Sequence, residues 1–186
     1  MTWPAELTPD RVPGTVRREI TVEAAASDDA RLVFTAVLRD RWFDAAENTE
    51  EIHGYEVRMV TEPPDLVVTS IEVRPRFLPF ADCPAAALAA QRLVGQRLTK
   101  GFRPAATEAL GRVEGCTHLL TLVLAIWNHQ VVAQYMLTRT DDGNRPGDAL
   151  DFERMVDACS GWREGGVAIR LARTEQPFPR SVDYGD

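Results

Sequence analysis

The first 75 residues alternate between apolar and polar positions, the period of a β-strand with one buried face. The polar run DAAENTEE at 44–51 interrupts this alternation and is expected to form a loop. Between the last two alternating segments, Glu-Pro-Pro-Asp at 62–65 is typical of a hairpin connection. The pattern predicts an antiparallel sheet with strands at 16–24, 31–40, 55–60 and 66–73.

The second half of the chain has the composition of helices. Two alanine- or leucine-rich segments stop at Gly95 and Gly111, and glycine is favoured just beyond a helix end. A much longer apolar segment follows, with no helix breaker inside it. Helices are therefore predicted at 84–94, 104–110, 118–137 and, from apolar spacing, 152–159, with a turn and a last strand at 165–173.

Together these elements predict an α+β fold, in which three to four helices cover one face of a small antiparallel sheet. The chain of 186 residues is long enough for one domain with a proper core. We expect that domain at 16–172, after an extended arm at 1–15 and before a C-terminal tail at 173–186.

Composition narrows the range of partners. The net charge is −7 and the Lys and Arg residues are not clustered, which argues against nucleic acid, because phosphate backbones are bound by concentrated positive charge. No apolar run reaches the length of about 18 residues that a membrane span needs. The first residues lack the apolar segment of a signal peptide, which favours the cytoplasm. Three cysteines then suit free thiols or metal ligands better than a disulfide framework.

Two of the three cysteines lie where predicted helices begin. Proline is favoured at the first helical position, so Pro84 would make Cys83 the N-cap of the first helix. Thr117 is the natural N-cap of the long helix and directly follows Cys116. The positive end of a helix stabilises a thiolate, the form of cysteine that binds metal or acts as a nucleophile.

Two histidines complete a candidate metal site. His118 is close to Cys116 in the sequence, and His53 lies where the polar loop is expected to enter the sheet. The predicted ligands His53, Cys83, Cys116 and His118 have the ligand types of a tetrahedral centre, but not the C-x-x-C spacing of a zinc ribbon. Asp82 is the candidate catalytic residue, as a general base or as the partner of a ligating histidine, and helix capping is its alternative role.

Two further residues are expected to play structural roles. His129 follows His118 by eleven residues on the same predicted helix, a rise of about 16 Å, so the two cannot bind one ion. We interpret His129 as structural or as part of a pocket wall. Cys159 shares helical spacing with Met155 and is expected in the core.

The order of these motifs resembles an uncharacterised bacterial family with a Gly-Cys-Thr-His-Leu signature, present here at 115–119. The resemblance covers about residues 16–170. It also includes the pair Ile52-His53, a cysteine before the first helix, a Leu-x-Gly after that helix and a late cysteine. These last three features correspond to Cys83, 93–95 and Cys159. The resemblance implies no settled activity.

A more distant similarity is to the NifU-like scaffolds of iron–sulfur cluster assembly, with a NifU/SufE-like fold. By order along the chain, Cys83 matches their middle cysteine, and Cys116 with His118 matches their late pair. His53 stands in place of their first cysteine, and Tyr55 in place of the aspartate that helps release a nascent cluster. These departures weaken the case for cluster assembly, whereas the metal binding that the resemblance implies is unaffected.

The leading hypothesis is a metal-centred protein that holds zinc or iron. We expect an enzyme that acts on a small organic molecule by Lewis-acid or activated-water chemistry, in hydrolysis, elimination or, with iron, oxidation. One alternative is an iron–sulfur or sulfur-transfer accessory protein, and another is a metal-free binding module in which the cysteines only pack. The expected partners are a small-molecule substrate and further copies of the chain in a homo-oligomer, with neither nucleic acid nor membrane.

Overall fold

A computed structural model describes residues 14–27, 31–44, 46, 48–99, 101–113, 115–138, 153, 156–157 and 159–176, with the backbone alone at 135–138. The chain divides into two compact units, which are described separately. One is Trp3–Gln130, and the other is Val131–Asp186 together with Met1–Thr2. The predicted arm at 1–15 and tail at 173–186 lie mostly outside the described residues.

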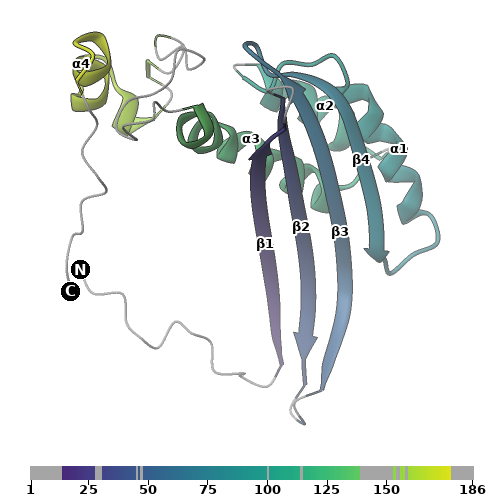
Figure 1. Cartoon of the computed structure of the whole chain (residues 1–186). Coiled ribbons are helices and arrows are strands. Elements are labelled where there is room, and N and C mark those ends of the chain that lie inside the picture. The colour runs from purple at the N-terminus through teal and green to yellow at the C-terminus, as the bar shows by residue number, and fades with distance from the viewer. Residues whose placement is uncertain are drawn as a thin grey trace. The chain divides into compact units, whose positions relative to one another are not determined.

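The first unit contains a four-stranded antiparallel sheet in the order β1-β2-β3-β4 (Figure 1). Its strands are β1 (Thr15–Ala26), β2 (Leu32–Phe43), β3 (Thr49–Glu62) and β4 (Val67–Phe77). The four predicted strands are confirmed, and all are longer than the alternation indicated. In particular, β3 already begins at Thr49, so the expected loop at 44–51 is shorter and His53 lies inside a strand rather than before it. The backbone N–H and C=O groups of this polar segment pair with those of β2. The polar side chains alone do not indicate this pairing.

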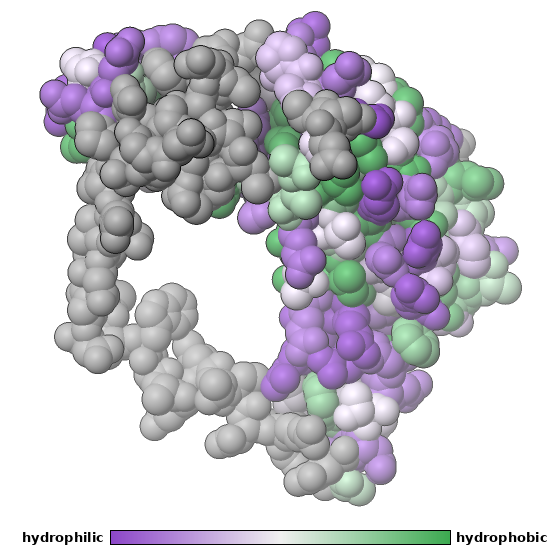
Figure 2. All heavy atoms as spheres, viewed as in Figure 1, coloured by the Kyte–Doolittle hydropathy of each residue, from purple (hydrophilic) through white to green (hydrophobic). Residues whose placement is uncertain are grey.

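The alternation fixes which side chains form the core. Phe34, Ala36 and Leu38 of β2 lie opposite Met59, Val57 and Tyr55 of β3, and all six side chains are fully buried. The opposite face of the sheet carries cross-strand ion pairs such as Glu19–Arg41 and Arg39–Glu51. In Figure 2 hydrophilic side chains gather over the lower part of the strands in this view.

Helices follow the sheet in the chain, and α1 and α2 cover one of its faces (Figure 1). The elements are η2 (Cys83–Ala85), α1 (Ala86–Ala89), η3 (Ala90–Leu93), α2 (Phe102–Leu110) and α3 (Thr117–Thr138). The single helix predicted at 84–94 is therefore wrong in detail, because it is a succession of 3₁₀ and α turns. The chain stays close to β4 here: the Gln91 amide donates to the Ile71 carbonyl at 2.7 Å, and the Gly95 N–H donates to the Val68 carbonyl at 2.8 Å.

The long helix α3 confirms the prediction of a helix at 118–137. Leu119, Leu122, Val123 and Ile126 are fully buried at the spacing of one helix face. Its N-cap is Cys116 rather than Thr117, because the Cys116 carbonyl accepts the first helical bond, from the Leu120 N–H at 2.8 Å. Within the described residues, no helix combines the length and the apolar character needed to cross a membrane.

The first cysteine is also displaced by one position from its expected place. Asp82, not Cys83, is the N-cap of η2, and its side chain forms no capping hydrogen bond. Cys83 is the first residue of this 3₁₀ turn, with Pro84 after it.

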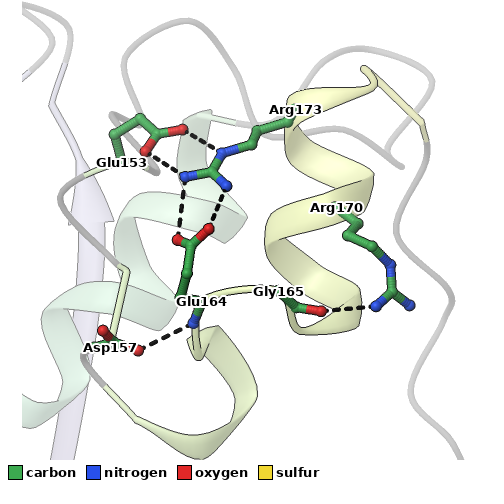
Figure 3. Close-up of polar contacts among 6 residues, drawn as sticks. All are labelled: Glu153, Asp157, Glu164, Gly165, Arg170 and Arg173. Carbon is green, nitrogen blue, oxygen red and sulfur yellow. Dashed lines mark hydrogen bonds and ion pairs between the residues drawn. The ribbon is translucent and has the colours of Figure 1, made fainter.

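The second unit contains η5 (Ser160–Trp162) and α4 (Val167–Arg173). The strand predicted at 165–173 is wrong, because this segment is helical after a turn at 164–165. Ile169 and Ala172, three residues apart, are its buried side chains, which is helical spacing. Arg173 at the end of α4 bonds both Glu153 and Glu164 (Figure 3).

Cys159 does not lie in the core, contrary to the expectation from its spacing. It is exposed and has an extended backbone, as the N-cap of η5. Phe152 and Met155, which suggested the helix at 152–159, lie outside the described residues. Taken together, the sheet and helices establish the predicted α+β class.

Candidate functional site

A row of three polar residues crosses the sheet at one end of its core face. In the pairing of the strands, Arg18 of β1 lies opposite Asp40 of β2, which lies opposite His53 of β3. Directly opposed residues of antiparallel strands point to the same face, so these side chains are neighbours. Immediately beyond this row the register shifts between Asp40 and Arg41, and Ile52 is left without an opposite residue.

His118 reaches this row from the first turn of α3. Its imidazole stacks on that of His53, with ring centroids 3.9 Å apart and an interplanar angle of 20°. The helix holds His118 there because the adjacent Leu119 is fully buried. One strand and one helix thus bring together two of the three histidines in the chain.

Asp40 is the buried acid at the centre of the site, with a side chain only 6% exposed. The Nε and Nη2 atoms of Arg18 each donate to one of its carboxylate oxygens at 2.7 Å. This pairing lowers the pKa of Asp40 more than burial raises it, and His118 and His53 lower it further. Asp40 is therefore ionised and oriented, although an unpaired carboxylate would be costly at this depth.

Both imidazoles direct a nitrogen toward the same oxygen of Asp40. His53 Nδ1 is 3.5 Å and His118 Nε2 is 3.7 Å from Asp40 Oδ2. Ordinary hydrogen bonds of this kind are about 2.7–3.2 Å long, so these contacts are too long for good ones. Two ligand atoms bound at about 2.1 Å to one ion, at a tetrahedral angle, are about 3.4 Å apart. The two nitrogen–oxygen distances are therefore those expected of ligand atoms around a shared cation.

The surroundings of His118 favour its neutral form. Burial lowers its pKa from the ordinary histidine value, and the positive charges of His53 and Arg18 lower it further, while Asp40 acts in the opposite direction. Neutral imidazole is the form that offers a lone pair to a metal ion.

Cys116 and Tyr55 border this group. The sulfur of Cys116 is 3.6 Å from Nδ1 of His118, the ring nitrogen on the side away from Asp40. Tyr55 is fully buried, and its hydroxyl makes no hydrogen bond of ordinary geometry to any described residue. Burial raises the pKa of Tyr55, and the nearby thiols of Cys116 and Cys83 raise it further.

The structure thus brings together some of the residues predicted from the sequence. Among the described residues, one group offers three metal-ligand atoms within 4.8 Å of one another, and its members are Asp40, His53 and His118. Cys116 contacts this group through His118 but is not one of the three, and neither is Cys83. Asp82 is exposed beside Cys83 and also lies outside the group.

Sequence reasoning missed Asp40, Arg18 and Tyr55. The alternation contained a signal for Asp40, since it continues the buried positions 34, 36 and 38 with an acid where an apolar residue is expected. Arg18 interrupts the apolar positions of β1 in the same way. Which strand residues meet across the sheet depends on register, which the sequence did not provide.

Comparison with known proteins gives a family and no activity. Neither the curated proteins nor the solved structures contain a significant match to this chain. A family model does match residues 16–132, a span that includes every residue of the site described above. The chain therefore belongs to the family described as protein of unknown function (DUF2889).

Proposed function

We propose that the chain is a metalloprotein in which Asp40, His53 and His118 hold a single zinc or iron ion. The observation that carries the proposal is the convergence of His53 Nδ1 and His118 Nε2 on one oxygen of Asp40, at separations too long for hydrogen bonds. Two histidines and one carboxylate bind catalytic zinc, and the same set forms the facial triad of non-haem iron(II) enzymes. In this proposal His53 and His118 remain from the ligand set expected from the sequence, and Asp40 takes the place of Cys83 and Cys116.

We further propose that the centre is catalytic and acts on a small organic molecule. Three protein ligands leave coordination positions for water and substrate, whereas structural zinc sites are closed by four. A metal at this place would supply Lewis-acid or activated-water chemistry. Arg18 supports such a role because it fixes the orientation of the ligating carboxylate from β1, the strand on the other side of Asp40 from His53.

Metal analysis tests the proposal directly. Protein purified without chelator, and apoprotein titrated with Zn²⁺ or with Fe²⁺ under exclusion of oxygen, should each bind one ion per chain. The variants Asp40→Asn, His53→Ala and His118→Ala should each lose most of the affinity. His129→Ala is the matched control, because His129 lies on the same helix but outside the group, and it should bind like the wild type.

Two results would reject the proposal. One is the absence of any specific binding by the wild-type apoprotein, which would favour a metal-free binding module. The other is unchanged binding by all three ligand variants, which would place the ion elsewhere in the chain.

A second candidate function is that of a sulfur-transfer or iron–sulfur accessory protein that uses Cys116. It is favoured by the contact between Cys116 and His118, because a thiol beside an imidazole at the start of a helix is a suitable nucleophile. A NifU-like relationship would fit this candidate. A visible absorbance band that forms with iron and sulfide and is lost in Cys116→Ala and Cys83→Ala would support it over the enzyme.

The cytoplasmic location and the formation of a homo-oligomer remain predictions. Fluorescence of a tagged chain in cells tests the first, and light scattering during size-exclusion chromatography tests the second.

A further inference from the structure

Cys116 and the proposed metal ligands contact opposite nitrogens of the same imidazole. The sulfur lies 3.6 Å from His118 Nδ1, whereas His118 Nε2 faces Asp40 at 3.7 Å. The in-plane directions of the two ring nitrogens diverge, so an ion bound at Nε2 lies on the far side of the ring from that sulfur. This arrangement separates the role of Cys116 from the role of a ligand.

A neutral imidazole has one N–H and one lone pair, on different nitrogens. To bind an ion beside Asp40, His118 must present the lone pair at Nε2 and therefore carry its hydrogen at Nδ1. This Nδ1 has a sulfur acceptor beside it, the Sγ atom of Cys116 at 3.6 Å. Ligating histidines almost always donate their second N–H to an acceptor, which fixes both the tautomer and the orientation of the ring.

We propose that Cys116 is a positioning residue for His118, not a metal ligand: its sulfur accepts the Nδ1–H and holds the Nε2 lone pair toward the ion. This inference rests on the proposed metal centre for its functional meaning, although the tautomer itself can be measured without metal. It assigns to the cysteine of the Gly-Cys-Thr-His-Leu run a role different from the ligation predicted from the sequence.

The local backbone explains why the sulfur of Cys116 lies next to the His118 ring. Cys116 is the N-cap of α3, and its carbonyl accepts the first helical bond from Leu120. His118 follows within the same first turn, so the spacing of the two side chains is set by the helix start and not by tertiary packing alone. The turn before it is closed by the Gly115 N–H, which donates to the Arg112 carbonyl at 2.8 Å.

Cobalt(II) distinguishes a ligating sulfur from a neighbouring one. A thiolate bound to Co²⁺ gives an intense charge-transfer band in the near ultraviolet, whereas nitrogen and oxygen ligands do not. We expect wild-type protein loaded with Co²⁺ to lack this band. Cys116→Ala should still bind one ion per chain, with affinity weaker by about 10- to 100-fold, as is usual when such a partner of a ligating histidine is lost.

Two variants make this measurement specific. Cys116→Ser keeps an acceptor next to Nδ1 and should recover part of the lost affinity, while Cys159→Ala removes an exposed cysteine and should bind like the wild type. An intense band that disappears in Cys116→Ala would show a ligating thiolate and overturn the inference. Equal affinity in the wild type and Cys116→Ala would also overturn it.

A second measurement separates this inference from the proposed metal centre. Long-range ¹H–¹⁵N spectra of the metal-free wild-type protein should show His118 as the Nδ1–H tautomer, and Cys116→Ala should shift it toward the Nε2–H form. An Nε2–H tautomer in the wild type would reject the role of Cys116. Failure to bind Co²⁺ together with the expected tautomer would instead reject the metal centre and leave the hydrogen bond established.

Discussion

The imidazoles of His53 and His118 stack almost parallel, with their centroids 3.9 Å apart, and both face the carboxylate of Asp40. Two imidazolium ions at this separation would repel each other, so the stack favours a state in which at least one ring is neutral. The stack thereby leaves the lone pair of a neutral imidazole beside the buried carboxylate of Asp40. This arrangement favours binding of a metal cation over protonation of the second ring.

The first prediction concerns the protonation of His118 in metal-free protein. Its pKa is lowered by burial and then by the positive charge of His53. Replacing His53 by Asn removes that charge, so the pKa of His118 should rise in His53→Asn. NMR titration of the ring signals measures this, with the His129 signals as an internal control that should not respond. A fall in the pKa of His118 would contradict the repulsion described above.

The second prediction concerns the Arg18–Asp40 pair. Arg18→Ala leaves a buried carboxylate without its partner and should lower the free energy of unfolding at neutral pH by about 1–2 kcal/mol. This is the low end for a hydrogen-bonded charged group, because the Arg18 side chain is 41% exposed and partly screened by solvent. Urea unfolding measures it. Arg39→Ala, which removes a more exposed arginine from the other face, should cost less.

The same pair gives the direction of the pH dependence. The folded-state pKa of Asp40 is lowered, so its contribution to stability is fully present above the unfolded-state value of about 3.9. It is lost as the pH falls through the lower folded-state pKa. The difference between the wild type and Arg18→Ala should therefore shrink in acid. A difference that grows below pH of about 4 would show that another group dominates.

A third prediction concerns Gly115, the first residue of the Gly-Cys-Thr-His-Leu run. A Cβ at this position would lie 2.2 Å from the carbonyl oxygen of Leu110, so the backbone must shift to accommodate alanine. Gly115→Ala should lower stability by about 1–3 kcal/mol, the usual cost of overpacking, and weaken metal binding because Cys116 and His118 follow directly. Thermal unfolding and metal titration measure the two effects.

The control for that substitution is Gly161→Ala. A Cβ there would meet only the sulfur of Cys159, at the ordinary contact distance of 3.7 Å. Its stability and metal affinity should match the wild type. If Gly115→Ala behaves in the same way, the close approach to Leu110 does not determine where α3 begins.

A fourth prediction concerns Tyr55, whose buried hydroxyl has no hydrogen bond of ordinary geometry within the part of the chain that the structure describes. Tyr55→Phe keeps the ring and removes a polar group that is costly to bury unpaired, so the free energy of unfolding should rise by about 1 kcal/mol. Chemical denaturation measures the change. A loss of stability of similar size would show that the hydroxyl has a partner, with the sulfur of Cys116 as the first candidate.

The fifth prediction concerns removal of metal. An ion that binds the native state contributes stability by mass action, about 2.7 kcal/mol at a free concentration of 100 Kd. A chelator should therefore lower the melting temperature of metal-loaded wild-type protein, and it should leave His118→Ala unchanged. A chelator effect of equal size in both proteins would indicate an ion bound elsewhere.

The sequence predicted much of the fold because its strongest signals are local. Alternation identified the strands, and Gly95 with Gly111 marked helix ends that the structure confirms. The error at 165–173 has a local cause as well, since a short apolar run without a clear period suits a strand or a helix. The segment is a helix in which Ile169 and Ala172 are buried on one face. Which side chains are buried depends on tertiary packing, which a short sequence pattern does not contain.

The site was only half predictable, for a different reason. His53 and His118 drew attention because histidine is rare in this chain, and Cys116 because it precedes a helix. Asp40 and Arg18 are ordinary charges in a sequence rich in them, and only the pairing of three strands makes them neighbours of His53. The start of α3 brings His118 to the group and the start of η2 adds no member to it, while the sheet supplies the carboxylate.

The unpaired Ile52 has a consequence for anyone who wishes to move this site into another protein. On one side of that residue the odd positions of β3 share the face of Asp40, and on the other side Glu51 shares the face of Arg41. A graft of Asp40 and His53 onto an ideal hairpin that keeps Ile52 in regular pairing would turn Glu51 inward and place a competing acid beside His53. A functional graft must therefore include the register shift at Ile52.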